Sequence, residues 1–383
     1  MNKTAISVIL ILLINASLLA HVEKTYYLTG KTETEEIAIE LDEYGDVCLL
    51  RYITSNNIYE QIMEGKIPRP GRFELASFFI DSTTNTRMVK DSLILVEYED
   101  DKWTGTWTYQ DGEKETFELG PILIDSIGHP YASAIKKYDV SPFNAYRTRN
   151  TTFIDGKRRK IAPGIFIQEI SDEKTGIQSF RVLPSKKKVP MTDSINEMLI
   201  ADQLQFISGF YSCVNGEKGR IYDIKYDVHF INQHIISYTL ITTTACRGAR
   251  VQTSYSHQTR YMKNTDPVSM EDLFWFGSKP QPELIEGEYN WFQYRYKEFG
   301  PQVMDLLKNL YPEKFTTGNE VDCKYDNVKL WQLPTWYLTN DGLYLGSKSS
   351  MSNKNCDEAE WSVIPYKLLI PYISIDYLLL AGR

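Results

Sequence analysis

An alternation of apolar and polar positions constrains the first third of the chain more than any other feature. Ile37, Ile39 and Leu41 occupy every second position, which is the period of a strand that buries one face. Further short apolar runs follow up to about residue 120, with turn signals at Gly45-Asp46 and Asp111-Gly112. Short strands at this spacing predict a small all-β barrel or sandwich over residues 22–130.

Two tryptophans in this region lie on one strand. Trp103 and Trp107 are four residues apart, so their side chains point to the same face. We expect both to belong to the core rather than to form an exposed platform for a ligand.

The second half of the chain mixes helix and strand patterns. After a predicted connector at residues 131–160, a helix is expected to begin near Asp193, followed by a three-stranded antiparallel meander between about 224 and 255. Helix signals return at Ser269, which begins a capping pattern, and at Pro301. A hairpin is expected over 336–345. Residues 161–383 therefore predict a larger α+β domain, and the whole chain is expected to be α+β.

The first twenty residues have the layout of a secretory signal peptide. Lys3 precedes an apolar run and a small-residue stretch that ends at Ala20. The run is too short for a membrane span, so we expect cleavage near Ala20, no stable membrane insertion, and a periplasmic or secreted location. The formal net charge of −8 disfavours nucleic acid as a partner and favours basic partners.

Five cysteines in an exported chain indicate disulfide bonds first. Cys213, Cys246, Cys323 and Cys356 allow three pairings, and we favour Cys213 with Cys246 and Cys323 with Cys356 because each pair flanks a stretch that is typical of a hairpin. Cys48 lies in an apolar segment and is expected to be a buried free thiol. No pair has CxxC spacing, so no metal site is expected.

The search for catalytic motifs is largely negative. The chain has no GxSxG, P-loop, HExxH or GxGxxG motif. Alternation places His229 on the polar side of its strand and His234 at a turn, so we expect solvent-facing histidines rather than a metal site. Ser256 and His257 are adjacent on a strand and should point to opposite faces, which is wrong for a nucleophile and its base. We therefore expect no catalytic residues and no cofactor, although an enzyme is not excluded.

The order of segments from about 190 to 373 resembles a known family. It is similar to the domain of unknown function in the extracellular part of the lysozyme-sensing anti-sigma factor RsiV and in PdaC-type peptidoglycan deacetylases. The matching segments are Ser194-Ile195-Asn196, the strand 235–240, the loop Arg247-Gly248-Ala249-Arg250, the segment 267–274, the hairpin 336–343, and Ile364-Pro365-Tyr366 with Leu368-Leu369.

The resemblance implies an exported, non-catalytic binding protein of the bacterial cell envelope. Its partner would be a cell-wall component such as a peptidoglycan fragment, or a wall-attacking basic protein such as lysozyme. The loop that reads Gly-Gly-Ala-His in the family is Arg247-Gly248-Ala249-Arg250 here, so a role of that histidine does not carry over. Two alternatives remain open, a cell-wall-modifying hydrolase with an unrecognised site and a purely structural envelope protein.

Three surface segments are the candidates for binding. Loops often carry recognition, which favours Arg247, Gly248 and Arg250 in one loop, and Asn340 and Asp341 in the turn of the last hairpin, where a purely structural turn is the simpler interpretation. The chain contains 26 tyrosines, and most of those in the second half fit half-buried scaffold positions. One aromatic run is too dense for a single buried stripe and predicts a contact surface; it contains Tyr289, Trp291, Tyr294 and Tyr296.

Overall fold

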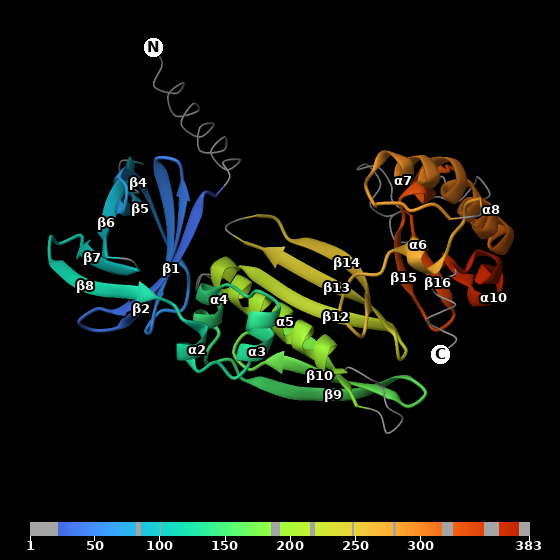
Figure 1. The fold of residues 1–383 in the computed structure, drawn as a ribbon, viewed down its shortest axis with the longest axis horizontal. Helices are drawn as coiled ribbons and strands as arrows, with labels where there is room; N and C mark the ends of the chain where they lie inside the picture. The colour runs from blue at the N-terminus through green and yellow to red at the C-terminus, as the bar shows by residue number, and fades with distance from the viewer. Residues whose placement is uncertain are drawn as a thin grey trace, which may run out of the picture.

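The computed structural model describes residues 22–81, 86–99, 101–184, 192–214, 219–246, 249–278, 281–315, 325–347 and 360–374. The predicted signal peptide at residues 1–20 lies outside them. An all-β part comes first, and sheets and helices follow (Figure 1). The predicted α+β fold class is confirmed. No helix in the described ranges is long and apolar enough to span a membrane.

The first part is a closed antiparallel barrel in which each strand pairs with the next and β8 pairs with β1. The barrel, rather than the sandwich, is therefore the fold of this region. Its strands are β1 (Lys24–Lys31), β2 (Glu36–Tyr44), β3 (Val47–Thr54), β4 (Gln61–Arg69), β5 (Arg72–Asp81), β6 (Thr86–Glu99), β7 (Lys102–Thr108) and β8 (Lys114–Pro121).

Aromatic and aliphatic side chains fill the barrel interior. Trp103 and Trp107 are 1% and 6% exposed, so the prediction that they belong to the core is confirmed. Gly105 lies between them on the same inward face and pairs with Phe117 of β8. A Cβ atom at Gly105 would lie 2.5 Å from the Phe117 ring. The glycine thus leaves room for the neighbouring aromatic ring.

The middle part begins with three short helices, α2 (Ile124–Ile127), α3 (Ala132–Lys137) and α4 (Pro142–Arg147). The predicted connector at 131–160 contains α3, α4 and most of β9. Two three-stranded sheets and one long helix follow. They are β9 (Phe153–Ala162), β10 (Ile165–Asp172) and β11 (Gln178–Leu183); α5 (Thr192–Val214); and β12 (Ile221–Ile231), β13 (Ile235–Ala245) and β14 (Gln252–Tyr261).

Helix α5 packs against both sheets through one apolar cluster. Met198 and Leu199 of the helix lie with Phe180 of β11 and with Val228 and Tyr238 of the meander. Alternation along β12 and β13 directs these meander residues to one face. The opposite face of the meander is consequently left for the C-terminal part.

The predicted disulfide between Cys213 and Cys246 is present and joins the end of α5 to the residue after β13. Cys48 is a buried free cysteine, as predicted. Cys323 and Cys356 lie outside the described residues.

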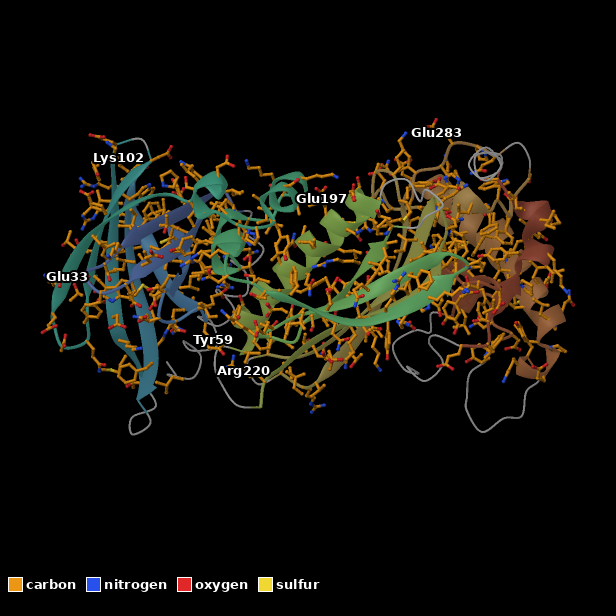
Figure 2. The ribbon with its side chains drawn as sticks, turned by 90° about the horizontal axis from the view of Figure 1, so that it is seen from below. Glu33, Tyr59, Lys102, Glu197, Arg220 and Glu283 are labelled. Atoms are coloured by element: carbon orange, nitrogen blue, oxygen red, sulfur yellow. A yellow bond between two sulfur atoms is a disulfide. The ribbon has the colours of Figure 1, made fainter. Side chains whose placement is uncertain are left out.

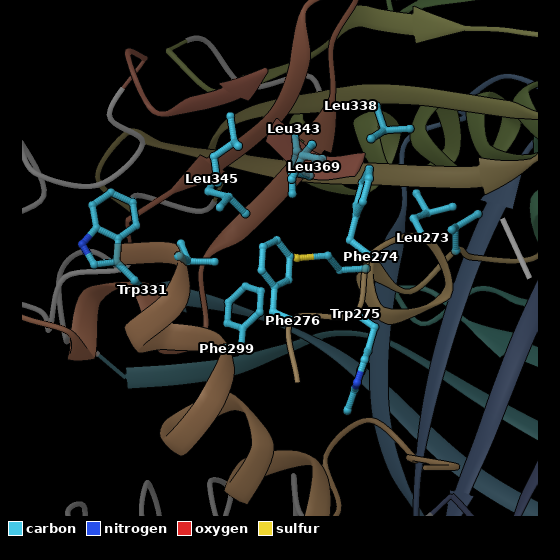
Figure 3. Packing of buried hydrophobic residues seen from close by; sticks show 14 of the residues in the cluster. Leu273, Phe274, Trp275, Phe276, Phe299, Trp331, Leu338, Leu343, Leu345 and Leu369 are labelled. Atoms are coloured by element: carbon cyan, nitrogen blue, oxygen red, sulfur yellow. The ribbon is translucent and has the colours of Figure 1, made fainter. Parts of the chain in front are cut away.

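The C-terminal part packs short helices around a small antiparallel sheet and one large apolar cluster (Figure 3). Ser269 accepts the N–H of Asp272 and Asp272 accepts the N–H of Ser269, which is the predicted capping box. The elements are α6 (Met270–Leu273), α7 (Tyr289–Tyr294), the π-helix η1 (Arg295–Phe299), α8 (Gly300–Leu310), η2 (Pro312–Lys314), α9 (Lys329–Gln332), β15 (Thr335–Leu338), β16 (Gly342–Gly346), β17 (Val363–Pro365), α10 (Tyr366–Leu369) and η4 (Ile370–Tyr372).

A buried polar network joins the barrel to the middle part, near Tyr59 in Figure 2. Arg147 of α4 approaches Glu60 at 3.3 Å and also donates to the hydroxyls of Ser208 and Ser212 of α5, at 3.0 and 2.8 Å. Ser212 donates to the same Glu60 carboxylate at 2.6 Å. One carboxylate from the barrel is therefore shared by α4 and α5.

An apolar cluster completes this junction. Ala38 and Ile53 point outward from the barrel and pack with Ile122 and Phe143, the latter from α4. The residues that alternate with Ala38 and Ile53 on the same strands point inward and belong to the barrel core. Strand β2 is consequently buried on both faces next to α4.

Replacing Gly105 by alanine is expected to destabilise the barrel, because the added methyl group would overlap the Phe117 ring. Overpacking of this kind lowers the free energy of unfolding by about 1–3 kcal/mol. Urea unfolding followed by tryptophan fluorescence would measure the change. Gly120→Ala is the matched control, since nothing lies within 4 Å of its added Cβ atom; equal stability of the two variants would contradict the prediction.

Candidate functional site

The predicted aromatic run divides between the surface and the interior. Tyr289 and Tyr296 are 74% and 42% exposed, whereas Trp291 and Tyr294 are buried. The run forms helix α7 and the start of the π-helix η1, so its residues face several directions. The structure therefore does not bring the four aromatic rings together on one surface.

A buried ion pair fixes the helical segment that carries this run. Arg295 Nε lies 2.8 Å from Glu271 Oε1, and both side chains are less than a tenth exposed. The guanidinium also lies over the rings of Trp291 and Phe299. Burial raises the pKa of Glu271, and the charge of Arg295 opposes that rise.

A pocket of about 370 Å³ lies beside this segment. We call it the α7 pocket. Four lining residues, Asn290, Gln293, Tyr294 and Lys297, follow the i, i+3, i+4, i+7 spacing of one helix face. The other lining residues come from the preceding loop and the end of η1; they are Trp275, Ser278, Pro282, Glu283, Leu284 and Glu298.

Two stacked rings make the inner wall of the α7 pocket. The centroids of Trp275 and Tyr294 are 4.1 Å apart with an interplanar angle of 12°. The indole N–H of Trp275 donates to the Ser278 carbonyl, and the Tyr294 hydroxyl accepts the N–H of Phe276. Figure 3 shows Trp275 at the edge of the C-terminal cluster, pointing away from Leu343. Burial raises the pKa of Tyr294, which stays a neutral phenol.

One carboxylate of the α7 pocket, that of Glu298, is hydrogen-bonded to the loop that precedes α7. Glu298 Oε2 accepts the backbone N–H of Ser278 at 2.8 Å and its hydroxyl at 3.0 Å. In the described part of the chain, the side chains of Asn290, Gln293 and Lys297 have no hydrogen-bond partner. The pocket thus offers two amides and an ammonium group to a ligand, in front of a fixed aromatic wall.

Apart from Tyr294, the predicted binding residues do not line the α7 pocket. Arg247 and Gly248 lie outside the described residues, and Arg250 is an exposed residue before β14. Asn340 donates to the Ile161 carbonyl at 3.3 Å, and the Asp341 N–H donates to Thr339. The structure gives Asn340 and Asp341 contacts within the hairpin turn and to the end of β9.

Two histidines converge in a way that alternation did not predict. His229 and His257 both lie 2.7 Å from the hydroxyl of Thr239, through Nε2 and Nδ1 respectively. Tyr337 of β15 stacks on His229 with centroids 3.9 Å apart. The expectation of solvent-facing histidines is wrong for His229, whose side chain is 15% exposed.

Strand pairing and the packing of β15 explain this arrangement. Thr239 pairs with Asp227 of β12 and with His257 of β14, and alternation puts His229 on the same face of β12 as Asp227. The hairpin of β15 then covers the same face, where the Leu338 N–H donates to Ser237. No group of three or more metal-binding residues occurs among the residues that the structure describes.

Comparisons with known proteins add three similar solved structures. No protein-family model and no curated protein matches the chain. A DUF3298 family member from Bacteroides fragilis is 13% identical, with 60% of this chain and 96% of that chain covered and a TM-score of 0.34. A DUF3298 family protein from Pseudomonas aeruginosa is 14% identical, with 59% and 93% covered and a TM-score of 0.30.

The third similar structure is a redesigned β-barrel, mFAP1, bound to DFHBI. It is 12% identical, covers 28% of this chain and 97% of that chain, and has a TM-score of 0.19. Because all three TM-scores are well below 0.5, they establish neither a shared overall arrangement nor a family. The resemblance of the second half to the RsiV extracellular domain stays a prediction.

The stability of the protein is expected to fall on mild acidification because of His229. Burial lowers the pKa of His229 in the folded state. Below the ordinary histidine pKa of about 6.5, His229 is therefore protonated more in the unfolded state than in the folded state, which favours unfolding. Acidification from pH 7.5 to 5.0 should therefore lower the unfolding temperature more for the wild type than for His229→Gln. Thermal unfolding at both pH values would measure this, and an identical pH dependence of the two proteins would contradict it.

Proposed function

We propose that the protein is an exported, non-catalytic binding protein of the bacterial cell envelope and that the α7 pocket takes a saccharide of the cell wall. The observation that carries the proposal is the composition of this pocket: about 370 Å³, a stacked Trp275–Tyr294 wall, and unpartnered amide and ammonium groups on one helix face. Its volume falls within the roughly 300–1,000 Å³ range of small-molecule sites.

The chemistry of the lining suits a sugar better than an apolar ligand. Sugar hydroxyls both donate and accept hydrogen bonds, and the amides of Asn290 and Gln293 offer both functions. The C–H groups of a sugar ring need an apolar wall, which Leu284 and the small exposed parts of Trp275 and Tyr294 provide. Peptidoglycan presents such rings together with carboxylates, which would pair with the ammonium group of Lys297.

Binding without turnover is favoured by the state of the carboxylates. Glycoside hydrolysis uses an acid and a second carboxylate that flank the scissile bond. Glu298 already accepts two hydrogen bonds from Ser278, which commits it to the loop. The alternative function, a cell-wall-modifying hydrolase, would have to use Glu283 without Glu298 as its second carboxylate.

Two further features support the remaining parts of the proposal. The disulfide between Cys213 and Cys246 suits an oxidising compartment outside the cytoplasm. Lysozyme remains the second candidate partner, since an acidic protein attracts a basic one. A folded protein, however, needs roughly 800 Å² of surface on each side, whereas the observation here is a concave pocket.

Soluble peptidoglycan fragments are expected to bind the full-length protein, and the Asn290→Ala, Gln293→Ala double variant is expected to weaken binding at least about tenfold. The loss of two hydrogen bonds of about 1 kcal/mol each accounts for this size. Isothermal titration calorimetry would measure the affinity. Tyr289→Ala is the matched control on the same helix, because its exposed side chain does not line the pocket.

The outcomes separate the candidate functions. Equal affinity of the double variant and the wild type would remove the α7 pocket as the site. Release of reducing ends from the fragments would favour the hydrolase. Capture of lysozyme with unchanged affinity in the double variant, and no binding of fragments, would favour the protein partner.

A further inference from the structure

A second, smaller pocket lies where the barrel meets the middle part. It encloses about 60 Å³, which is room for a few water molecules or one small ion. Its walls come from four segments: the end of β3 with the loop after it, the end of α4 with the chain that follows it, the turn after β10, and α5. The lining residues are Thr54, Ser55, Ile58, Arg147, Arg149, Asn150, Thr151, Lys174 and Tyr211.

The charge of this lining is opposite to that of the whole chain. Arg147, Arg149 and Lys174 all line the pocket, and none of its nine lining residues is acidic. The chain as a whole has a net charge of −8. A pocket with three cations and no carboxylate in its wall favours an anion.

Nearby carboxylates compensate two of the three cations only in part. Arg147 approaches Glu60 through Nη2, but its buried Nε has no hydrogen-bond partner. Arg149 approaches the exposed Glu36 at 3.2 Å. Lys174 has no ion pair in the part of the chain that the structure describes. Arg147 therefore contributes charge from inside the wall, whereas Arg149 and Lys174 are the cations that a ligand can reach.

The neutral groups of the wall supply further donors. The Ser55 hydroxyl oxygen accepts the Glu36 N–H, and the Thr54 hydroxyl oxygen accepts the Asn57 N–H. Each hydroxyl hydrogen therefore remains available to donate. Asn150 and Thr151 add an amide and a hydroxyl group. Several donors around a small volume match the several acceptor oxygens of one oxyanion.

We propose that this junction pocket binds one small oxyanion, a phosphoryl or carboxylate group, through Lys174 and Arg149, with the buried positive charge of Arg147 behind them. The site is separate from the α7 pocket and does not depend on the saccharide proposal. Because its walls come from the barrel and from the middle part, a bound oxyanion also holds the two parts together.

Thermal unfolding of the full-length protein in sodium phosphate, sodium acetate and sodium chloride at matched ionic strength would test this site. A ligand that binds only the folded protein raises the unfolding temperature in proportion to RT ln(1 + [L]/Kd). We expect phosphate or acetate to raise it above the chloride value. Phosphate also stabilises folded proteins through exclusion from their surface, so the part of the rise that Lys174→Gln removes reports the site. Such a rise in phosphate alone identifies a phosphoryl site, and one in acetate identifies a site that accepts carboxylates.

Variants of exposed residues keep the test independent of folding. Lys174→Gln should weaken phosphate binding about tenfold in calorimetry while leaving the unfolding temperature in chloride unchanged. Lys308→Gln, an exposed lysine on α8, is the matched control and should bind like the wild type. Unfolding temperatures in phosphate and acetate equal to those in chloride, or equal phosphate affinity of Lys174→Gln and the wild type, would overturn the proposal.

Discussion

Arg147 brings a charged group into the interior at the point where the barrel, α4 and α5 meet, and the local arrangement follows from the need to compensate it. Its side chain is 1% exposed, and Glu60 of the barrel supplies the opposite charge. Removing one partner of such a buried pair typically costs about 3–5 kcal/mol. The pair therefore specifies how the barrel docks, and the same arginine is one of the three cations that line the junction pocket.

A second buried ion pair has the same role in the C-terminal part. Arg295 and Glu271 join the π-helix to α6, and the arginine also covers the Trp291 ring. This contact fixes the rotation of α7, so that Asn290, Gln293 and Lys297 face the α7 pocket while Trp291 faces the interior. In both parts, a paired arginine orients the helix that lines a pocket.

The parts of the fold that depend on local patterns could be predicted. Alternation identified strands of the barrel and the meander, the capping box at Ser269 is a short-range signal, and the position of Cys213 and Cys246 on either side of a predicted hairpin indicated their pairing. The α7 pocket could not be predicted. Trp275 and Tyr294, which form its wall, are separated in the chain by a loop whose course the sequence does not indicate. The helical spacing of residues 290, 293, 294 and 297 was the one signal available, and the density of aromatic rings hid it.

The sequence by itself determined the strand-rich first third, the meander, the last hairpin, the helices that begin near Asp193, Ser269 and Pro301, and that the chain is α+β. Only the tertiary structure decided that the barrel closes, that both faces of β2 are buried, and that β15 covers His229 and His257 where both contact Thr239. The reason is that a periodic pattern reports the burial of a face but not the element that buries it. That choice depends on contacts between residues far apart in the chain, such as Arg147 with Glu60 and Leu338 with Ser237.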